Sequence, residues 1–230
     1  YPVSFIGDSA GSSFENLYSM AFDGVDDYIQ APLDGTSTGG ILAATYSDID
    51  LTISLWFKLN SSQNKHGIFQ WGNQLADPTP FISLVQWVTP DRVRFYVDGT
   101  YQTMVNVNLG QWYNIVLTRT ASDNTYRGYL DGVEFFAYDD GGSIVQAFWD
   151  SAIDIYLSAG YFGGAACNVD EVAIWNSVQN VTTIYNSGVP NNLNDLTTPP
   201  TAWYRMGENG SWKSPQWLLP ENSNVDNSRI

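Results

Sequence analysis

The sequence has only one cysteine and one histidine among its 230 residues. A lone cysteine, Cys167, cannot form an internal disulfide, and with His66 as the only other candidate no thiolate zinc site can be built. The apolar neighbours of Cys167 in AACN predict a small buried packing residue. No Gly-x-Ser-x-Gly elbow accompanies His66, which argues against a serine triad, so we expect His66 to lie at the surface.

Basic residues are also scarce. Lys and Arg number 9 against 24 Asp and Glu, which gives a formal net charge of −15. Nucleic acids and anionic membrane surfaces both require a positive footprint, so neither is an expected partner. A cation, a neutral sugar or a basic protein is compatible with this charge. Most of the acidity is explained by the solubility it confers.

Long apolar runs are missing as well. No segment is long enough to span a bilayer, and no signal peptide is recognisable. The chain begins at Tyr1 rather than Met, which predicts a processed or excised piece. The low lysine content, the single cysteine and a charged fraction of only 14% favour an extracellular or virion-surface location.

Apolar and aromatic residues are plentiful, at 43% and 15% of the chain, and provide ample material for a core. Helical periodicity is nearly absent, whereas alternation with period two recurs throughout. So many short strands joined by turns predict an all-β sandwich or jelly roll. The predicted strands are Tyr18–Phe22, Asp27–Ala31, Leu51–Leu59, Gly67–Trp71, Phe81–Trp87, Arg92–Val97, Trp112–Arg119, Tyr126–Leu130, Val133–Tyr138, Ile153–Ser158 and Asn168–Trp175.

Turn and cap signals complete the local predictions. Asp-Gly pairs in YVDGTY and GYLDGVEFF predict two tight hairpins, because such pairs supply the positive φ angles that a two-residue turn requires. One short helix is predicted from Val178 to Asn186, capped by Ser177 and ended by Gly188 and Pro190.

The domain organisation follows from the C-terminal composition. A further strand is predicted at Thr201–Gly207, after a linker rich in Asn and Pro. We expect one domain over residues 1–207 and a polar tail or linker over 208–230.

Five motifs occur in a fixed order: SMAFDGVDDYIQ, LTISLWFKLN, QWYNIVLTRT, YRGYLDGVEF and NVDEVAIWN. Together they resemble the laminin G-like, concanavalin A-like jelly-roll lectin family over about Ser19 to Asn186. The resemblance implies a concanavalin A-like jelly-roll β-sandwich of two antiparallel sheets with one short helix. A looser likeness of the WYRMG segment to large structural proteins of viruses and phages concerns only the end of the domain.

The resemblance also implies a calcium ion where the first and last strands meet. Carried over to this sequence, the candidate ligands are Asp23, Gly24 through its carbonyl, and Asp170. Calcium takes six to eight oxygens, so a distant partner such as Asp170 is required beside the local ones. The alternative is an ordinary turn at Asp23 and Gly24, and we expect Asp26 and Asp27 to be turn residues in either case.

Catalysis is not expected. Glycoside hydrolysis needs two carboxyl groups across a cleft. The glucanases that share this fold place them on one strand as Glu-x-Asp-x-(x)-Glu, and no segment matches that pattern. Asp139 and Asp140 precede two glycines and are interpreted as loop residues.

Aromatic residues next to loops are the candidates for binding a ligand. Sugars present apolar C–H faces that stack on aromatic rings, while hydroxyl groups bond to amides and carboxylates. The candidates are Trp87, Trp149, Tyr161 and Phe162; Trp71 also borders a predicted loop. For any one of them the alternative is a side chain that covers the edge of the core.

Two functions agree with these observations. The first is a non-catalytic lectin-like module that binds a carbohydrate or a cell surface and holds a structural calcium ion. The second is a structural, decoration or fibre protein of a virion, whose partners would include other virion proteins.

Overall fold

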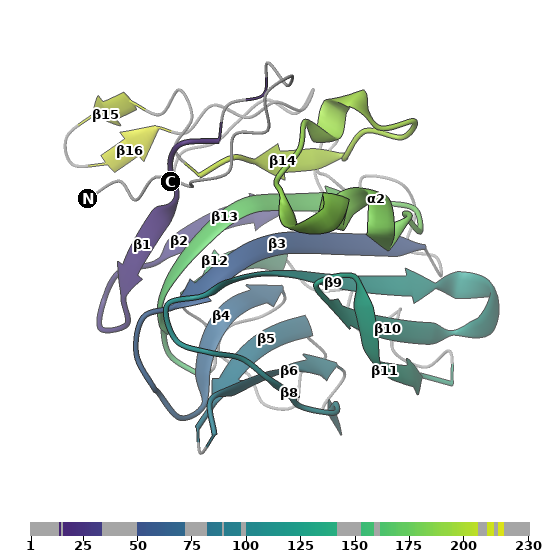
Figure 1. The fold of residues 1–230 in the computed structure, drawn as a ribbon, viewed down its shortest axis with the longest axis horizontal. Coiled ribbons are helices and arrows are strands. Elements are labelled where there is room, and N and C mark those ends of the chain that lie inside the picture. Colours follow the sequence, from purple (N-terminus) through teal and green to yellow (C-terminus); the bar gives the residue numbers. More distant parts are fainter. Residues whose placement is uncertain are drawn as a thin grey trace.

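Two antiparallel sheets form the fold (Figure 1). The computed structural model describes the chain at residues 14, 16–33, 50–71, 82–88, 90–97, 100–141, 153–158, 162–206, 211–213 and 216–218. The predicted all-β jelly-roll sandwich is confirmed within these ranges.

Sheet A has the strand order β1-β13-β3-β9-β10-β11, and β14 pairs with β13. Strand β3 occupies one edge of β13, so β1 and β14 lie end to end along the other edge. The strands are β1 (Met20–Asp23), β3 (Leu51–Leu59), β9 (Trp112–Thr120), β10 (Thr125–Leu130), β11 (Val133–Asp139), β13 (Ala166–Trp175) and β14 (Ala202–Tyr204).

Sheet B has the order β2-β12-β4-β5-β6-β7, with β8 also paired to β6. Its strands are β2 (Ile29–Leu33), β4 (His66–Trp71), β5 (Ile82–Trp87), β6 (Arg92–Val97), β7 (Thr100–Tyr101), β8 (Val105–Asn106) and β12 (Ile153–Leu157).

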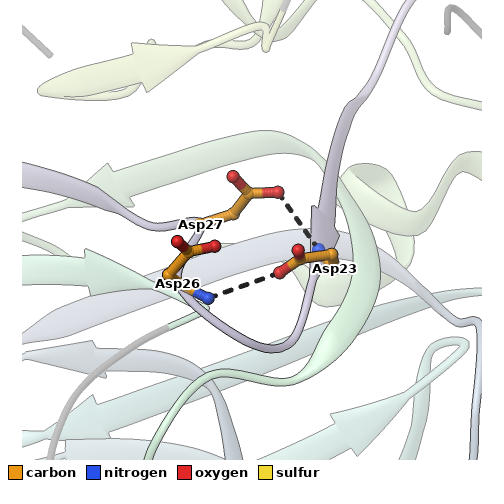
Figure 2. Close-up of side chains that lie close together, drawn as sticks. All are labelled: Asp23, Asp26 and Asp27. Carbon is orange, nitrogen blue, oxygen red and sulfur yellow. Dashed lines mark hydrogen bonds between the residues drawn. The ribbon is translucent and has the colours of Figure 1, made fainter.

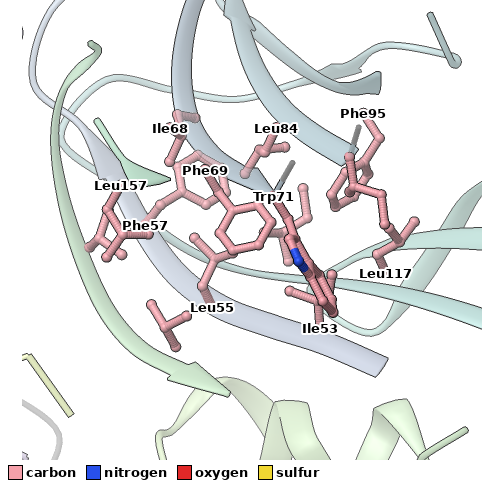
Figure 3. Close-up of a cluster of buried hydrophobic side chains, with 14 of the residues drawn as sticks. Ile53, Leu55, Phe57, Ile68, Phe69, Trp71, Leu84, Phe95, Leu117 and Leu157 are labelled. Carbon is pink, nitrogen blue, oxygen red and sulfur yellow. The ribbon is translucent and has the colours of Figure 1, made fainter. Parts of the chain in front are cut away.

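The core lies between the sheets, where alternate side chains of each strand meet (Figure 3). Ile53, Leu55 and Phe57 of β3 are each at most 1% exposed, as are Phe69 and Trp71 of β4. Trp71 is therefore a core residue rather than a loop-border residue, because its position in β4 alternates onto the inner face. Cys167 is buried as predicted.

The eleven strands predicted by alternation are all present, with ends that agree within two residues. Both Asp-Gly hairpins are confirmed. Val97 pairs with Thr100, and in the second hairpin Asp131 and Gly132 have φ angles of 49° and 78°. The two-residue strands β7 and β8 were not predicted, because a segment so short shows no periodicity.

The predicted helix is shorter than expected. Helix α2 covers Val181–Tyr185, and its N-cap is Asn180, whose side chain accepts a hydrogen bond from the Thr183 amide at 3.1 Å. Ser177 does not cap it, and its hydroxyl oxygen accepts a hydrogen bond from the side-chain amide of Gln179 at 2.6 Å. The helix ends at Asn186, which adopts the left-handed conformation, two residues before Gly188.

Residues 181–196, which include α2, pack on the outer face of sheet A at β9 and β13 (Figure 1). A second buried cluster lies on this face. It joins Val116 of β9 and Trp175 of β13 to Ile184 of α2, to Leu193, and to Trp203 of β14. The 3-10 helices are η1 (Ala121–Asp123), η2 (Asn186–Gly188) and η3 (Leu193–Asp195).

Within the predicted tail, β15 (Ser211–Lys213) and β16 (Gln216–Leu218) pair as an antiparallel hairpin. Its role as a tail or linker stays a prediction. Among the described residues, no helix is long and apolar enough to cross a membrane.

Candidate functional site

The outer face of sheet B is the candidate site. Residues 181–196 pack on part of the outer face of sheet A, whereas no described helix lies on the outer face of sheet B. On β6, Val93, Phe95 and Val97 are at most 1% exposed and face the core. The alternate residues Arg92 and Arg94 therefore project outward, as does Tyr96.

The ladder pairs place one row of side chains straight across this face. Tyr156, Gln70, Ser83, Tyr96 and Tyr101 are consecutive partners from β12 to β7. The first three are at most 6% exposed, while Tyr96 and Tyr101 are partly exposed. The accessible part of the face therefore lies toward β6 and β7.

Four aromatic rings gather at that end, and we call Trp87, Tyr96, Tyr101 and Phe162 the aromatic cluster. The ring centroids of Tyr96 and Tyr101 are 4.7 Å apart, and those of Trp87 and Tyr101 are 5.8 Å apart, both edge-to-face. Phe162, in the segment before β13, lies edge-on to Tyr96 at 5.7 Å. Such contacts fix the rings relative to one another and leave a rigid, partly exposed apolar surface.

Three cations adjoin the aromatic cluster, and we call Lys65, Arg92 and Arg94 the basic rim. The guanidinium carbon of Arg94 lies 3.7 Å from the Tyr101 ring centroid and 4.2 Å from that of Trp87. Lys65 Nζ is 5.2 Å from the Trp87 centroid, and Arg92 pairs with Trp87 across the ladder. These are cation–π distances.

Burial lowers the pKa of Arg94; the phenol of Tyr101 raises this pKa and the neighbouring charge of Arg92 lowers it. An arginine keeps its charge throughout the physiological range even so. The basic rim is therefore a permanently positive region on a protein that is negative overall.

Two of the four predicted ligand residues belong to this site. Trp87 and Phe162 are members of the aromatic cluster, whereas Trp149 and Tyr161 lie outside the described residues. Tyr96, Tyr101 and Arg94 were not predicted. The alternation in RVRFYV gives the outward direction of Arg94 and Tyr96, and the Asp-Gly hairpin gives the pairing of Tyr101 with Tyr96.

The predicted calcium ligand Asp23 is the last residue of β1, where the exposed turn toward β2 begins (Figure 2). Asp23 Oδ1 accepts hydrogen bonds from the backbone amides of Val25 at 2.7 Å and Asp26 at 3.4 Å. The backbone amide of Asp23 in turn donates to Asp27 Oδ2 at 3.3 Å. One carboxylate oxygen from each of Asp23, Asp26 and Asp27 lies within 4.8 Å of the others. Calcium takes six to eight oxygens, so these three carboxylates would supply part of a coordination shell.

The structure does not bring Asp170 to this turn. Asp23 pairs with Ala166, and Asp170 lies four residues further along β13, about 13 Å away at the usual strand rise. Asp170 is fully buried, and its Oδ1 accepts the Glu171 amide at 2.8 Å. The predicted pairing of Asp23 with Asp170 around one ion therefore does not fit the register.

Gly24 occupies a position that only glycine fits. Its φ is +78°, and a Cβ atom there would lie 2.6 Å from the amide nitrogen of Ala166. That close approach fixes the turn against the start of β13. The role of Gly24 seen in the structure is thus steric.

Glu171, next to Asp170, is buried. Its carboxylate accepts the Trp203 indole N–H at 2.5 Å and the Arg205 Nε–H at 3.3 Å. It lines a small pocket with Ser54 and Asn191 that has room for about one water molecule. A sugar ring does not fit there, so Glu171 is a structural residue.

Solved structures of similar fold include domain 4 of AbnA, a GH43 extracellular arabinanase from Geobacillus stearothermophilus, in complex with arabinotriose. It is 17% identical, with a TM-score of 0.55 over 77% of this chain and 80% of that one. The Ruminococcus gnavus IT-sialidase CBM40 bound to alpha2,3 sialyllactose is 10% identical, with a TM-score of 0.52 over 73% and 95% of the two chains.

A native heptameric SAP-like pentraxin from Limulus polyphemus is 12% identical, with a TM-score of 0.50 over 75% and 80%. At these identities the likeness concerns the fold. A comparison with curated protein sequences gave no match. Residues 23–185 match a Laminin_G_3 domain, and with the two-sheet fold this shows that the chain belongs to the concanavalin A-like lectin/glucanases superfamily.

Proposed function

We propose that this chain is a non-catalytic carbohydrate-binding module and that its sugar site is the outer face of sheet B at the aromatic cluster. The observation that carries the proposal is the set of four ring contacts on a partly exposed face. Aromatic faces are electron-rich and suit the weakly positive C–H groups of a pyranose or furanose ring. Arg94 and Arg92 supply donors for hydroxyl groups beside them.

The superfamily and its structural neighbours support the carbohydrate part of this proposal. Two of the neighbours described above are complexes with arabinotriose and sialyllactose. Neither identity is high enough to transfer the sugar, so the choice of ligand has to come from the residues of this chain.

The non-catalytic part of the proposal is supported by the composition of the face. Glycoside hydrolysis needs two carboxyl groups on either side of the scissile bond. Strands β4 to β7, which build the candidate site, contain no Asp or Glu. We therefore expect binding without turnover of the bound saccharide.

A glycan array with Trp87→Ala tests the proposal. We expect wild-type protein to bind a defined set of saccharides, and Trp87→Ala to lose at least about tenfold in affinity for them. Trp112→Ala is the matched control, because Trp112 is also partly exposed with a lysine 5.2 Å from its ring centroid, but on sheet A. Equal losses in both variants, or no binding by the folded wild type, would contradict the proposal.

We retain a structural calcium ion as part of the proposal, at the Asp23 turn rather than between Asp23 and Asp170. The spacing of the Asp23, Asp26 and Asp27 oxygens supports it. An ion there would offset two of the three neighbouring negative charges and hold the β1–β2 connection against β13. This role is structural, because the turn belongs to sheet A's edge strand and not to β4–β7.

The virion alternative and the extracellular location stay predictions. A virion role would require a repeating protein interface. The contacts described here are all within one chain.

A further inference from the structure

The basic residues of this chain are few, yet three of the nine lie together at the aromatic cluster. The 24 acidic residues are distributed differently, since none occurs in β4 to β7. A neutral sugar needs no such concentration of positive charge. The overall composition therefore does not explain why three basic residues lie together at the aromatic cluster.

Arg94 is held in a specific way. Two aromatic rings contact its guanidinium, at 3.7 Å and 4.2 Å from the ring centroids. These contacts use the charge of the group and leave its N–H donors, which lie in the guanidinium plane, for hydrogen bonds. The rings also restrict the side chain before any ligand arrives, which lowers the entropy lost on binding.

The Nε–H of Arg94 is buried, and among the described residues it has no hydrogen-bond acceptor. No ion pair joins Arg94 to a described carboxylate either, in contrast to Arg119, Arg127 and Arg205. A buried donor on a charged group is unfavourable when it has no acceptor. An anionic oxygen bound to the terminal N–H groups would compensate the charge of the same guanidinium.

We infer that the saccharide bound at this face carries an anionic group, a carboxylate or a sulfate ester, and that Arg94 binds it while the aromatic cluster stacks on the sugar ring. This inference rests on the proposed function. The planar guanidinium can make two parallel hydrogen bonds to either kind of anion. Arg92 and Lys65 contribute positive charge beside it without needing a direct contact.

The competing explanation is that Arg94 only packs the two rings together. In that case its loss would weaken the binding of neutral and acidic saccharides to the same extent. If Arg94 binds the anion, its loss removes the preference for acidic saccharides and leaves the affinity for neutral ones. The ratio of the two affinities therefore separates the explanations, whatever happens to overall affinity.

The test measures dissociation constants for saccharide pairs that differ only in the anionic group: lactose with 3-O-sulfated lactose, sialyllactose with its neutral carboxamide, and uronate-capped glycans with the corresponding hexose-capped glycans. We expect wild-type protein to prefer the acidic member of a pair by about tenfold or more. The sialylated and uronate pairs measure the preference for a carboxylate, and the sulfated pair measures the preference for a sulfate ester.

In Arg94→Gln we expect the preference to fall to within about twofold of unity. In Arg94→Lys we expect an intermediate preference, because the charge stays but the planar donor pair is lost. Arg127→Gln is the control, since Arg127 lies on β10 in sheet A, where it pairs with Asp123 and Glu134. Thermal melts show whether each variant is folded. If Arg94→Gln is unfolded, the preference measured for Arg94→Lys decides the role of Arg94.

The possible failures are distinguishable. Equal binding of neutral and acidic saccharides that still depends on Trp87 would overturn the inference and leave the proposed function standing. A preference for acidic saccharides that survives in both Arg94 variants would overturn the role of Arg94. No binding of any saccharide by folded wild-type protein would overturn both.

Discussion

At the residue scale, a buried ion pair inside the core makes the sharpest prediction. Arg119 Nε and Asp140 Oδ2 are 3.0 Å apart, and the two side chains are 2% and 0% exposed. Replacing Asp140 by Asn removes the negative charge that faces Arg119 Nε. Breaking a buried pair in this way costs about 3–5 kcal/mol. We therefore expect Asp140→Asn to lower the free energy of unfolding by that amount in urea denaturation.

An exposed pair on the same sheet serves as the control. Arg127 and Glu134 are 3.6 Å apart, with 36% and 44% of their side chains exposed. Water already screens these charges, so Glu134→Gln should change stability by less than about 1 kcal/mol. Similar losses in the free energy of unfolding for Asp140→Asn and Glu134→Gln would mean that the charge of Asp140 is not needed to stabilise Arg119 in the folded protein.

At the element scale, Gly24 determines how the β1–β2 turn meets β13. Its φ is +78°, and a Cβ atom would lie 2.6 Å from the Ala166 amide nitrogen, a backbone atom of a ladder residue. Backbone cannot move aside as a flexible side chain can. We expect Gly24→Ala to destabilise the protein through both the left-handed conformation and the clash.

Gly110→Ala isolates the first of these two effects. Gly110 has a φ of +73° with nothing within 4 Å of the position a Cβ would take. Its replacement should cost about 1–2 kcal/mol from the left-handed conformation alone. Chemical denaturation of both variants measures the difference, and a Gly24→Ala loss no larger than that of Gly110→Ala would show that the clash relaxes freely.

At the scale of the whole molecule, the sequence was sufficient for the eleven longer strands but not for the short strands β7 and β8 or for what long-range pairing decides. The strand Arg92–Val97 was predicted by alternation, and in the structure this alternation places Val93 and Phe95 in the core and Arg94 on the outside. The contact of Arg94 with Trp87 needed the β5–β6 register as well. The pairing of Asp23 with Asp170 failed because it depended on which end of β13 meets β1. Strands so far apart in sequence pair through tertiary packing, and no local pattern records their register.

The stability of the whole molecule also tests the calcium proposal. An ion that binds only the folded state stabilises it by mass action, by about 2.7 kcal/mol when calcium is present at 100 times its Kd. We expect the Tm in excess calcium to exceed the Tm in EDTA. Asp23→Asn should abolish this difference, because Asp23 supplies one of three oxygens within 4.8 Å.

Asp170→Asn is the discriminating control for the same experiment. Asp170 is fully buried, so its replacement should lower the Tm in both buffers yet leave the difference between them intact, since it lies about 13 Å from the turn along β13. Identical wild-type melts in calcium and EDTA would remove the ion from the proposal. A calcium effect lost in Asp170→Asn but kept in Asp23→Asn would place the ion at the other end of the β1–β13 ladder.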